Sequence, residues 1–260
     1  MGQRSQIDAL VLSAGGLFAA YQAGVLKALW PFWKPDIVVG TSAGALNAWL
    51  VAGGAGPDEL IERWVHPDAG RAIKFRNSRD LWNGYFDPAP LLEQTRRIHR
   101  DFPRKLPLGV VSIEVPQFRP RLFRNDEITP EQLLATCSIL LFYPWVRING
   151  RRLVDGGLFE PMPLWAAAAM GATRVVAINA LPRITPWAIH LVLSGMHRVR
   201  KMPVPHDLDI SVISPSGAMG TARDSMVWEK DHVERWVEMG MRDGEAFVKK
   251  NIAGLKPLAR

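Results

Sequence analysis

Apolar residues in the N-terminal part of the chain fall into two kinds of stretch, short strand-like runs and longer helical segments. The runs at 7–13 and 36–39 are mostly apolar, as expected of parallel strands that are buried on both faces. The segments at 20–30 and 45–52 are rich in Ala and Leu and predict helices. Strand, glycine turn, helix, strand, sharp turn and helix follow in that order, which predicts two successive βα units of a parallel sheet.

The same two patterns predict the remaining elements. Strands are expected at 108–115, 116–124, 174–179 and 208–213, with a hairpin at 146–154 that turns at Asn149-Gly150. Helices are expected at 58–65, 129–137, 163–171 and 224–250, and an apolar segment at 187–196 is expected to pack as a core helix. Asp58 and Thr129 are the predicted N-caps of the first two helices. The pattern predicts an α/β fold with a central, mostly parallel sheet flanked by helices.

No internal repeat or long linker divides the chain, so we expect residues 1–260 to form one domain. Residues 66–105 have little strand character and are expected to form a helical insertion or cap. Residues 221–260 are expected to supply C-terminal helices.

The clearest chemical motif is Gly-Thr-Ser-Ala-Gly at residues 40–44, between a predicted strand and a predicted helix. This is the context that a nucleophile elbow requires. Gly40 and Gly44 have a steric reason to be glycine, because a Cβ beside the strained turn would collide with the neighbouring strand or helix. The motif alone is a common accident, but its context predicts Ser42 as a nucleophile.

A second glycine motif, Gly15-Gly16, lies at the start of the first predicted helix. Consecutive glycines there expose backbone N–H groups to an anion, either the oxyanion of acyl transfer or a phosphate. The phosphate interpretation is weaker, because neither the spacing G-x-G-x-x-G nor a P-loop lysine is present. Gly15 and Gly16 are therefore candidate oxyanion donors.

Three motifs in order, at residues 12–26, 40–45 and 153–157, carry a resemblance to the patatin-like phospholipase family that spans about residues 7 to 180. The resemblance implies the three-layer fold of that family and a lipid acyl hydrolase acting on phospholipid or related acyl esters. It implies a Ser–Asp dyad of Ser42 and Asp155, with Gly156 and Gly157 completing the Asp-Gly-Gly motif. It implies neither a metal nor another cofactor.

The chain departs from the family pattern at four positions. The family has glycine at positions 14 and 19 and a basic residue at position 18, where this chain has Ala14, Ala19 and Phe18. Pro161 stands where the family has Asn. Alanine keeps the backbone N–H, so the oxyanion hole can survive, but these departures leave open a catalytically weak module that binds lipid or a partner.

Two other chemistries use the same serine. Acyl transfer to an acceptor other than water needs no different residues. A Ser-His-Asp triad is compatible with the chain order, although no histidine has a supporting motif. The candidate bases for such a triad are His190, His197, His206 and His232.

Lys and Arg outnumber Asp and Glu by 32 to 25, a formal net charge of +7, which favours an anionic partner. An anionic membrane surface is a candidate, whereas nucleic acid is not expected because no recognised motif accompanies the charge. Basic and aromatic residues are interspersed in the 66–105 insertion. They could form a cap that meets anionic lipid, but a solvated helical insertion with its own small core is the favoured interpretation.

The single cysteine, Cys137, excludes an internal disulfide and fits a reducing compartment. Its apolar surroundings predict a packed helix residue rather than a nucleophile. We find no apolar run of membrane-spanning length and no signal-peptide core. The expected location is therefore cytoplasmic, with any membrane contact peripheral.

Overall fold

The computed structural model describes residues 6–76, 84–157, 159–181 and 202–251 of the chain. The apolar segment at 187–196, which contains His190, lies outside the described residues, and so does His197.

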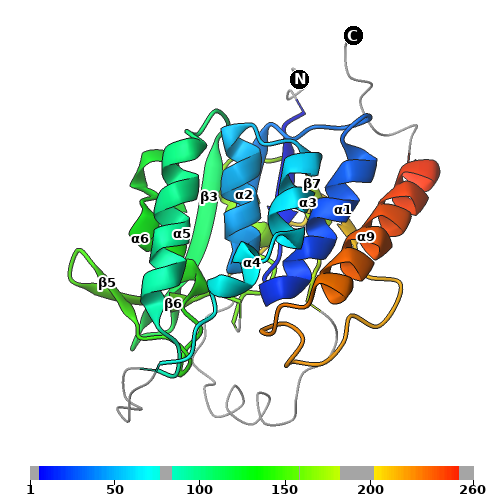
Figure 1. The fold of residues 1–260 in the computed structure, drawn as a ribbon. Helices are drawn as coiled ribbons and strands as arrows, with labels where there is room; N and C mark the ends of the chain where they lie inside the picture. The colour runs from blue at the N-terminus through cyan, green and yellow to red at the C-terminus, as the bar shows by residue number, and fades with distance from the viewer. Residues whose placement is uncertain (1–5, 77–83, 158, 182–201, 252–260) are drawn as a thin grey trace.

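A single sheet forms the centre of the described structure (Figure 1). Its order is β5-β6-β3-β2-β1-β7-β8, with β4 paired to β3 in addition. The pairs from β3 through β2, β1 and β7 to β8 are parallel, whereas β4, β5 and β6 join as antiparallel strands. The mostly parallel sheet predicted from the sequence is confirmed. The strands are β1 (Asp8–Leu12), β2 (Ile37–Thr41), β3 (Leu108–Val115), β4 (Arg119–Arg124), β5 (Val146–Ile148), β6 (Arg151–Asp155), β7 (Arg174–Ile178) and β8 (Asp209–Ile213).

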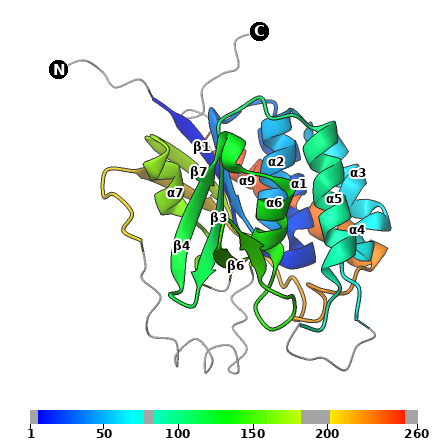
Figure 2. The same ribbon diagram turned by 90° about the vertical axis from the view of Figure 1, so that its left-hand side faces the viewer.

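Helices cover both faces of the sheet. Figure 2 shows α7 on one side, and α1, α2, α3, α5 and α6 on the other. Side chains of β1 alternate between the two layers, with Leu10 and Leu12 in the larger core beside α1 and α2, and Ala9 and Val11 in the core beside α7. The predicted three-layer arrangement is therefore present. The helices are η1 (Gly16–Ala19), α1 (Ala20–Leu29), α2 (Ala43–Gly53), α3 (Pro57–Val65), α4 (Asp68–Arg71), α5 (Pro88–Asp101), η3 (Asn125–Glu127), α6 (Pro130–Cys137), α7 (Leu164–Ala169) and α9 (Lys230–Asn251).

The described part of the 66–105 insertion contributes α4 and α5. Helix α5 packs against α6 and α2 and so belongs to the helix layer on the sheet (Figure 1). A small apolar core joins Phe86 and Leu91 of the insertion to Leu134 and Tyr143 from α6 and the loop after it. Ion pairs tie several of its arginines to neighbouring carboxylates: Arg71 and Arg97 to Asp68, Arg96 to Glu131, and Arg104 to Asp126.

Of three local predictions, the structure confirms one and corrects two. Asp58 is not a helix cap, because Gly56 occupies that position with Pro57 in the first turn. Thr129 is the N-cap of α6, as predicted, and its N–H donates to the Gln132 side chain at 2.9 Å. The C-terminal region holds one described helix, α9, that starts only at Lys230.

Candidate active site

The ends of β2 and β6 meet on one edge of β3. Strand β4 pairs with β3 along residues 109–114, so β2 and β6 share the opposite edge. Thr41 at the end of β2 pairs with Val111, and Asp155 at the end of β6 pairs with the next residue, Ser112. The two strands run toward each other and stop head to head. This arrangement brings Asp155 next to the residue after Thr41. The sequence predicted a strand end at Asp155 but not that its strand is antiparallel to its neighbour.

Ser42 lies in the turn between β2 and α2, with φ 54° and ψ −137°. This backbone conformation with positive φ is unfavourable for a residue with a Cβ and is typical of strained functional turns. A Cβ on Gly40 would collide with the backbone of Gly44 and Ala45, and one on Gly44 would collide with the carbonyl of Leu12. The two glycines therefore allow the tight turn that presents the Ser42 hydroxyl.

The Ser42 hydroxyl donates a hydrogen bond of 2.6 Å to Oδ2 of Asp155. Both residues are buried. The backbone N–H of Gly157 donates to the other carboxylate oxygen, Oδ1. A Cβ on Gly156 would meet the Thr41 hydroxyl, and one on Gly157 would meet Ala14, which explains why both positions after Asp155 are glycine.

Burial raises the pKa of Asp155 to about 7, against the opposing effect of the hydrogen bonds from Ser42 and Gly157. A carboxylate of this pKa is suited to accept a proton near neutral pH. Cys137, next to this region, is buried, and burial together with the charge of Asp155 raises the pKa of its thiol. A neutral thiol is a poor nucleophile, as the sequence predicted for Cys137.

Thr136 supports the backbone of the nucleophile elbow through hydrogen bonds. The sequence did not predict it as a site residue. Its hydroxyl accepts the Ser42 backbone N–H at 2.9 Å and donates to the carbonyl of Val111 at 2.6 Å. Thr136 is fully buried, so this bridge is shielded from water. A polar residue within the apolar second half of this helix, residues 133–137, was the available sequence indication.

The glycine loop lies between the end of β1 and α1, with Gly16 at φ 55°. Within the described residues, the N–H groups of Gly15 and Gly16 have no hydrogen-bond partner, whereas their neighbours do. The N–H of Ala14 donates to the carbonyl of Pro161 at 2.8 Å, and that of Leu17 donates to the carbonyl of Ser225 at 2.9 Å. Gly15 and Gly16 thus keep two N–H groups without a partner in the described structure and stay candidate oxyanion donors, and the backbone of Pro161 supports the loop.

Phe18, which stands where the family has a basic residue, is buried against α9. Its ring meets Trp236 edge-on, with the centroids 4.8 Å apart. Glycines bring α9 close to α1, since a Cβ on Gly24 or Gly240 would collide with the facing helix backbone. An apolar contact with α9 therefore anchors the loop.

A buried polar network connects the loop to the elbow helix. Gln22 donates to the carbonyl of Ser13 at 2.8 Å, and Asn47 of α2 donates to Gln22 at 2.9 Å. The indole of Trp64 donates in turn to Asn47 at 2.9 Å. These side chains fix β1, α1, α2 and α3 relative to one another. Sequence reasoning did not identify this network, because its members are far apart along the chain.

The described histidines that could complete a triad lie elsewhere. His206 is exposed and precedes the edge strand β8, at the amino ends of the parallel strands, whereas Ser42 follows the central strand β2 at their carboxyl ends. His232 of α9 lies 3.9 Å from Asp224 and 3.5 Å from Glu229. Within the part of the chain that the structure describes, neither histidine hydrogen-bonds to Ser42 or Asp155. Among the described residues, no group of three or more potential ligands could hold a metal ion.

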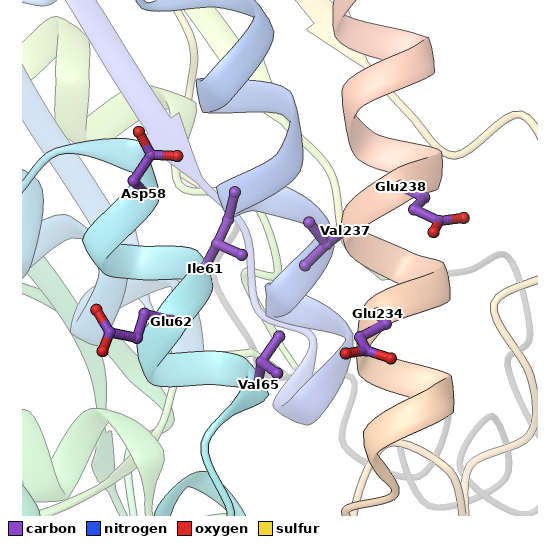
Figure 3. A pocket seen from close by; sticks show the side chains of 7 residues that line it. All are labelled: Asp58, Ile61, Glu62, Val65, Glu234, Val237 and Glu238. Atoms are coloured by element: carbon purple, nitrogen blue, oxygen red, sulfur yellow. The ribbon is translucent and has the colours of Figure 1, made fainter.

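Figure 3 shows a shallow groove between α3 and α9. Apolar side chains of both helices point into it, and carboxylates flank them. It contains none of the residues of the elbow, the Asp155 turn or the glycine loop, so it is separate from the candidate active site. The residues that line it are Asp58, Ile61, Glu62, Val65, Glu234, Val237 and Glu238.

The model of the patatin-like phospholipase family matches residues 10–168, which is more than half of the chain. The chain belongs to the patatin-like phospholipase family. The matched stretch includes the glycine loop, the elbow at Ser42 and the turn at Asp155, so the family assignment covers all three parts of the candidate site.

Two fungal relatives match a shorter stretch. Patatin-like phospholipase domain-containing proteins of Neurospora crassa and Chaetomium globosum are 45% and 44% identical over 75 residues. That stretch is 28% of this chain and only 8% and 9% of those proteins. Among solved structures, VipD from Legionella pneumophila matches with a TM-score of 0.52 and 10% identity, over 95% of this chain and 67% of VipD. The likeness to VipD is one of fold.

Within the described residues, we find no helix that is long and apolar enough to span a membrane.

Proposed function

We propose that this protein is a lipid acyl hydrolase of the phospholipase A or esterase type, with Ser42 as nucleophile and Asp155 as base. The observation that carries the proposal is the 2.6 Å hydrogen bond from the hydroxyl of Ser42, whose backbone has a strained conformation, to the buried carboxylate of Asp155, whose pKa is about 7. The free N–H groups of Gly15 and Gly16 and the family membership support it.

In the first half of the reaction, Asp155 accepts the proton of Ser42 as Oγ attacks the ester carbonyl carbon. The carbonyl electron pair moves to oxygen, and the N–H groups of Gly15 and Gly16 stabilise the resulting oxyanion. Collapse of the tetrahedral intermediate breaks the bond to the leaving alcohol, which takes the proton from Asp155. An acyl-serine and a free alcohol result.

In the second half, the carboxylate of Asp155 accepts a proton from a water molecule that attacks the acyl carbon. The second tetrahedral intermediate releases Ser42, which regains its proton, and a carboxylic acid leaves. The substrates on this proposal are phospholipids or related acyl esters.

The test is hydrolysis of short- and medium-chain p-nitrophenyl esters and of a phospholipid by wild type, Ser42→Ala and Asp155→Asn. The proposal predicts loss of activity in both folded variants, by about 10²-fold or more for the base. Alanine variants of each histidine serve as controls and should retain activity. Loss in a histidine variant would instead support a Ser-His-Asp mechanism.

Two further outcomes separate the remaining alternatives. Transfer of the acyl group to an added alcohol in preference to water would identify an acyltransferase that uses the same site. Binding to liposomes without turnover of any ester would indicate a lipid-binding module, and the altered positions Ala14, Phe18 and Ala19 would then be the first to revert.

A further inference from the structure

Four large apolar side chains lie exposed near the carboxyl-terminal edge of the sheet: Phe75 (73% exposed), Leu141 (66%), Tyr85 (49%) and Trp145 (47%). We refer to these four as the apolar face. Exposed apolar patches of this kind, with a polar rim, mark interaction surfaces.

The apolar face rests on one packed unit. Phe75 and Phe86 form a bridge between their backbones, and their rings lie 5.0 Å apart. The N–H of Phe86 donates to the carbonyl of Phe142 at 2.8 Å, and the ring of Phe142 lies 6.2 Å from Tyr85. The segments at 72–76, 84–87 and 139–145 are therefore held together beneath the exposed side chains.

Leu141 is anomalous in two ways. It has φ 75°, a conformation that favours Gly or Asn, and its apolar side chain points into solvent. Neither property benefits a protein that is surrounded only by water, since strain and exposed apolar area both cost stability. The exposure is explained if the side chain enters an apolar phase, and the turn at Leu141 is the backbone conformation that presents it.

Cationic side chains border the apolar face. The guanidinium of Arg152 lies 5.0 Å from the centroid of the Trp145 ring. Lys74 and Arg147 are exposed, and their side chains make no ion pair with any residue that the structure describes. Aromatic side chains beside unpaired cations suit the headgroup region of an anionic bilayer.

The apolar face is also connected to the candidate active site. The carbonyl of Ser138 accepts the backbone N–H of Asp155 at 2.9 Å, and the loop that bears Leu141 and Trp145 begins at this residue. Figure 1 shows the β5–β6 hairpin and the start of α5 in the lower part of the molecule, and β6 ends at Asp155. A bilayer on this face would lie at the end of the molecule where Ser42 is presented.

We propose that the apolar face and its cationic rim dock this protein on an anionic lipid bilayer, with Leu141 and Phe75 inserted and Lys74, Arg147 and Arg152 at the headgroups. The inference rests on the proposed hydrolysis of lipid esters, and it specifies the substrate as lipid presented in an anionic membrane.

The test measures co-sedimentation of the full chain with vesicles of phosphatidylcholine, with and without phosphatidylserine. Binding is measured in the Ser42→Ala background, so that the vesicles are not consumed. Phe75→Ser combined with Leu141→Asn should lower partitioning at least about tenfold. Lys74→Gln combined with Arg147→Gln should lower binding to anionic vesicles about tenfold and leave binding to neutral vesicles unchanged.

Two controls separate docking from folding. Phe32→Ser removes a side chain that is 39% exposed and precedes β2, at the amino ends of the parallel strands and so away from the apolar face. This substitution should leave vesicle binding unchanged. Leu141→Asn should not lower the melting temperature, because Asn tolerates the positive φ. The same substitutions are also made in the wild-type protein, which retains Ser42. These variants should hydrolyse a soluble short-chain ester at the wild-type rate.

If both double variants bind vesicles as well as the Ser42→Ala parent does, the proposal is overturned. A chain that self-associates through this face without binding vesicles, which analytical ultracentrifugation would show, would also overturn it. Hydrolysis of the soluble ester without vesicle binding would refute the docking surface and leave the proposed function standing. Vesicle binding with the expected variant pattern, but no hydrolysis of any ester, would support the surface and refute the hydrolase.

Discussion

Asp155→Asn should stabilise the protein at alkaline pH while it abolishes hydrolysis. Burial raises the pKa of Asp155 from its ordinary value of 3.8 to about 7. Between these values the folded state keeps a proton that the unfolded state has lost. Wild-type stability therefore falls as pH rises through this window and levels off above about pH 7.

The size of the effect follows from the same two pKa values. The gap between 3.8 and about 7 corresponds to about 4 kcal/mol of lost stability above the window, at about 1.36 kcal/mol per pH unit. Asparagine keeps the shape without the charge, but its single amide oxygen cannot accept from both the Ser42 hydroxyl and the Gly157 N–H. One of these two hydrogen bonds is therefore lost, which costs about 1 kcal/mol. The net gain expected at about pH 8.5 is therefore about 3 kcal/mol, and it vanishes near pH 4.5.

Urea unfolding at both pH values measures this difference directly. Asp8→Asn is the matched control, because Asp8 is also a buried carboxylate on a strand. Burial raises the pKa of Asp8, but the hydrogen bonds and charge of Arg174, together with the hydrogen bonds of Gln6 and Trp33, lower it by a larger amount. The net shift of the Asp8 pKa is therefore downward. Neutralising Asp8 should thus destabilise the protein at about pH 8.5, the opposite sign. Equal free energies of unfolding for Asp155→Asn and wild type at both pH values would refute the reasoning about Asp155.

Three further predictions concern the proposed reaction. Because Asp155 must be ionised to accept the Ser42 proton, kcat/KM for a neutral ester should rise with pH through an apparent pKa of about 7; a flat profile across this range would contradict this role. Thr136→Val should lower kcat about tenfold with little change in KM, and Thr136→Ser should restore it. Thr95→Val, which removes a buried hydroxyl bonded within α5, is its control, and an equal loss there would indicate a general packing effect. Phe18→Arg should cost at least about 3 kcal/mol in denaturant unfolding, since it buries an unpaired charge against Trp236; unchanged stability with higher activity would contradict the anchoring role.

The fold and the elbow were predictable because local sequence determines them. A buried parallel strand needs an apolar run, and a tight strand-to-helix turn around Ser42 needs Gly40 and Gly44. The turn at Asn149-Gly150 was likewise readable, and both residues have positive φ, as a short hairpin turn requires.

The pairing of Asp155 with Ser42 could not be predicted from local sequence, because Asp155 lies 113 residues after Ser42. Only the family resemblance pointed to it as the partner. An aspartate before two glycines is by itself an ordinary turn sequence. Its position opposite Ser42 results from β2 and β6 meeting head to head on β3, and no local pattern reveals the direction in which β6 runs.

The supporting contacts could not be predicted, because they join distant segments through side-chain geometry. Phe18 contacts Trp236 of the last described helix, and Asn47 joins Gln22 to Trp64. Pro161 contributes a backbone carbonyl, which no side-chain comparison considers. Residues of this kind support a site without carrying a motif.

Activation of the Ser42 nucleophile by Asp155 is tested most directly by covalent labelling with an alkyl fluorophosphonate, mapped by mass spectrometry. We predict one adduct, on Ser42, which is absent in Ser42→Ala and forms about 10²-fold more slowly in Asp155→Asn. Labelling should be unchanged in alanine variants of His190, His197, His206 and His232. Equal labelling rates in Asp155→Asn and wild type, or loss of labelling in a histidine variant, would contradict the Ser42–Asp155 dyad.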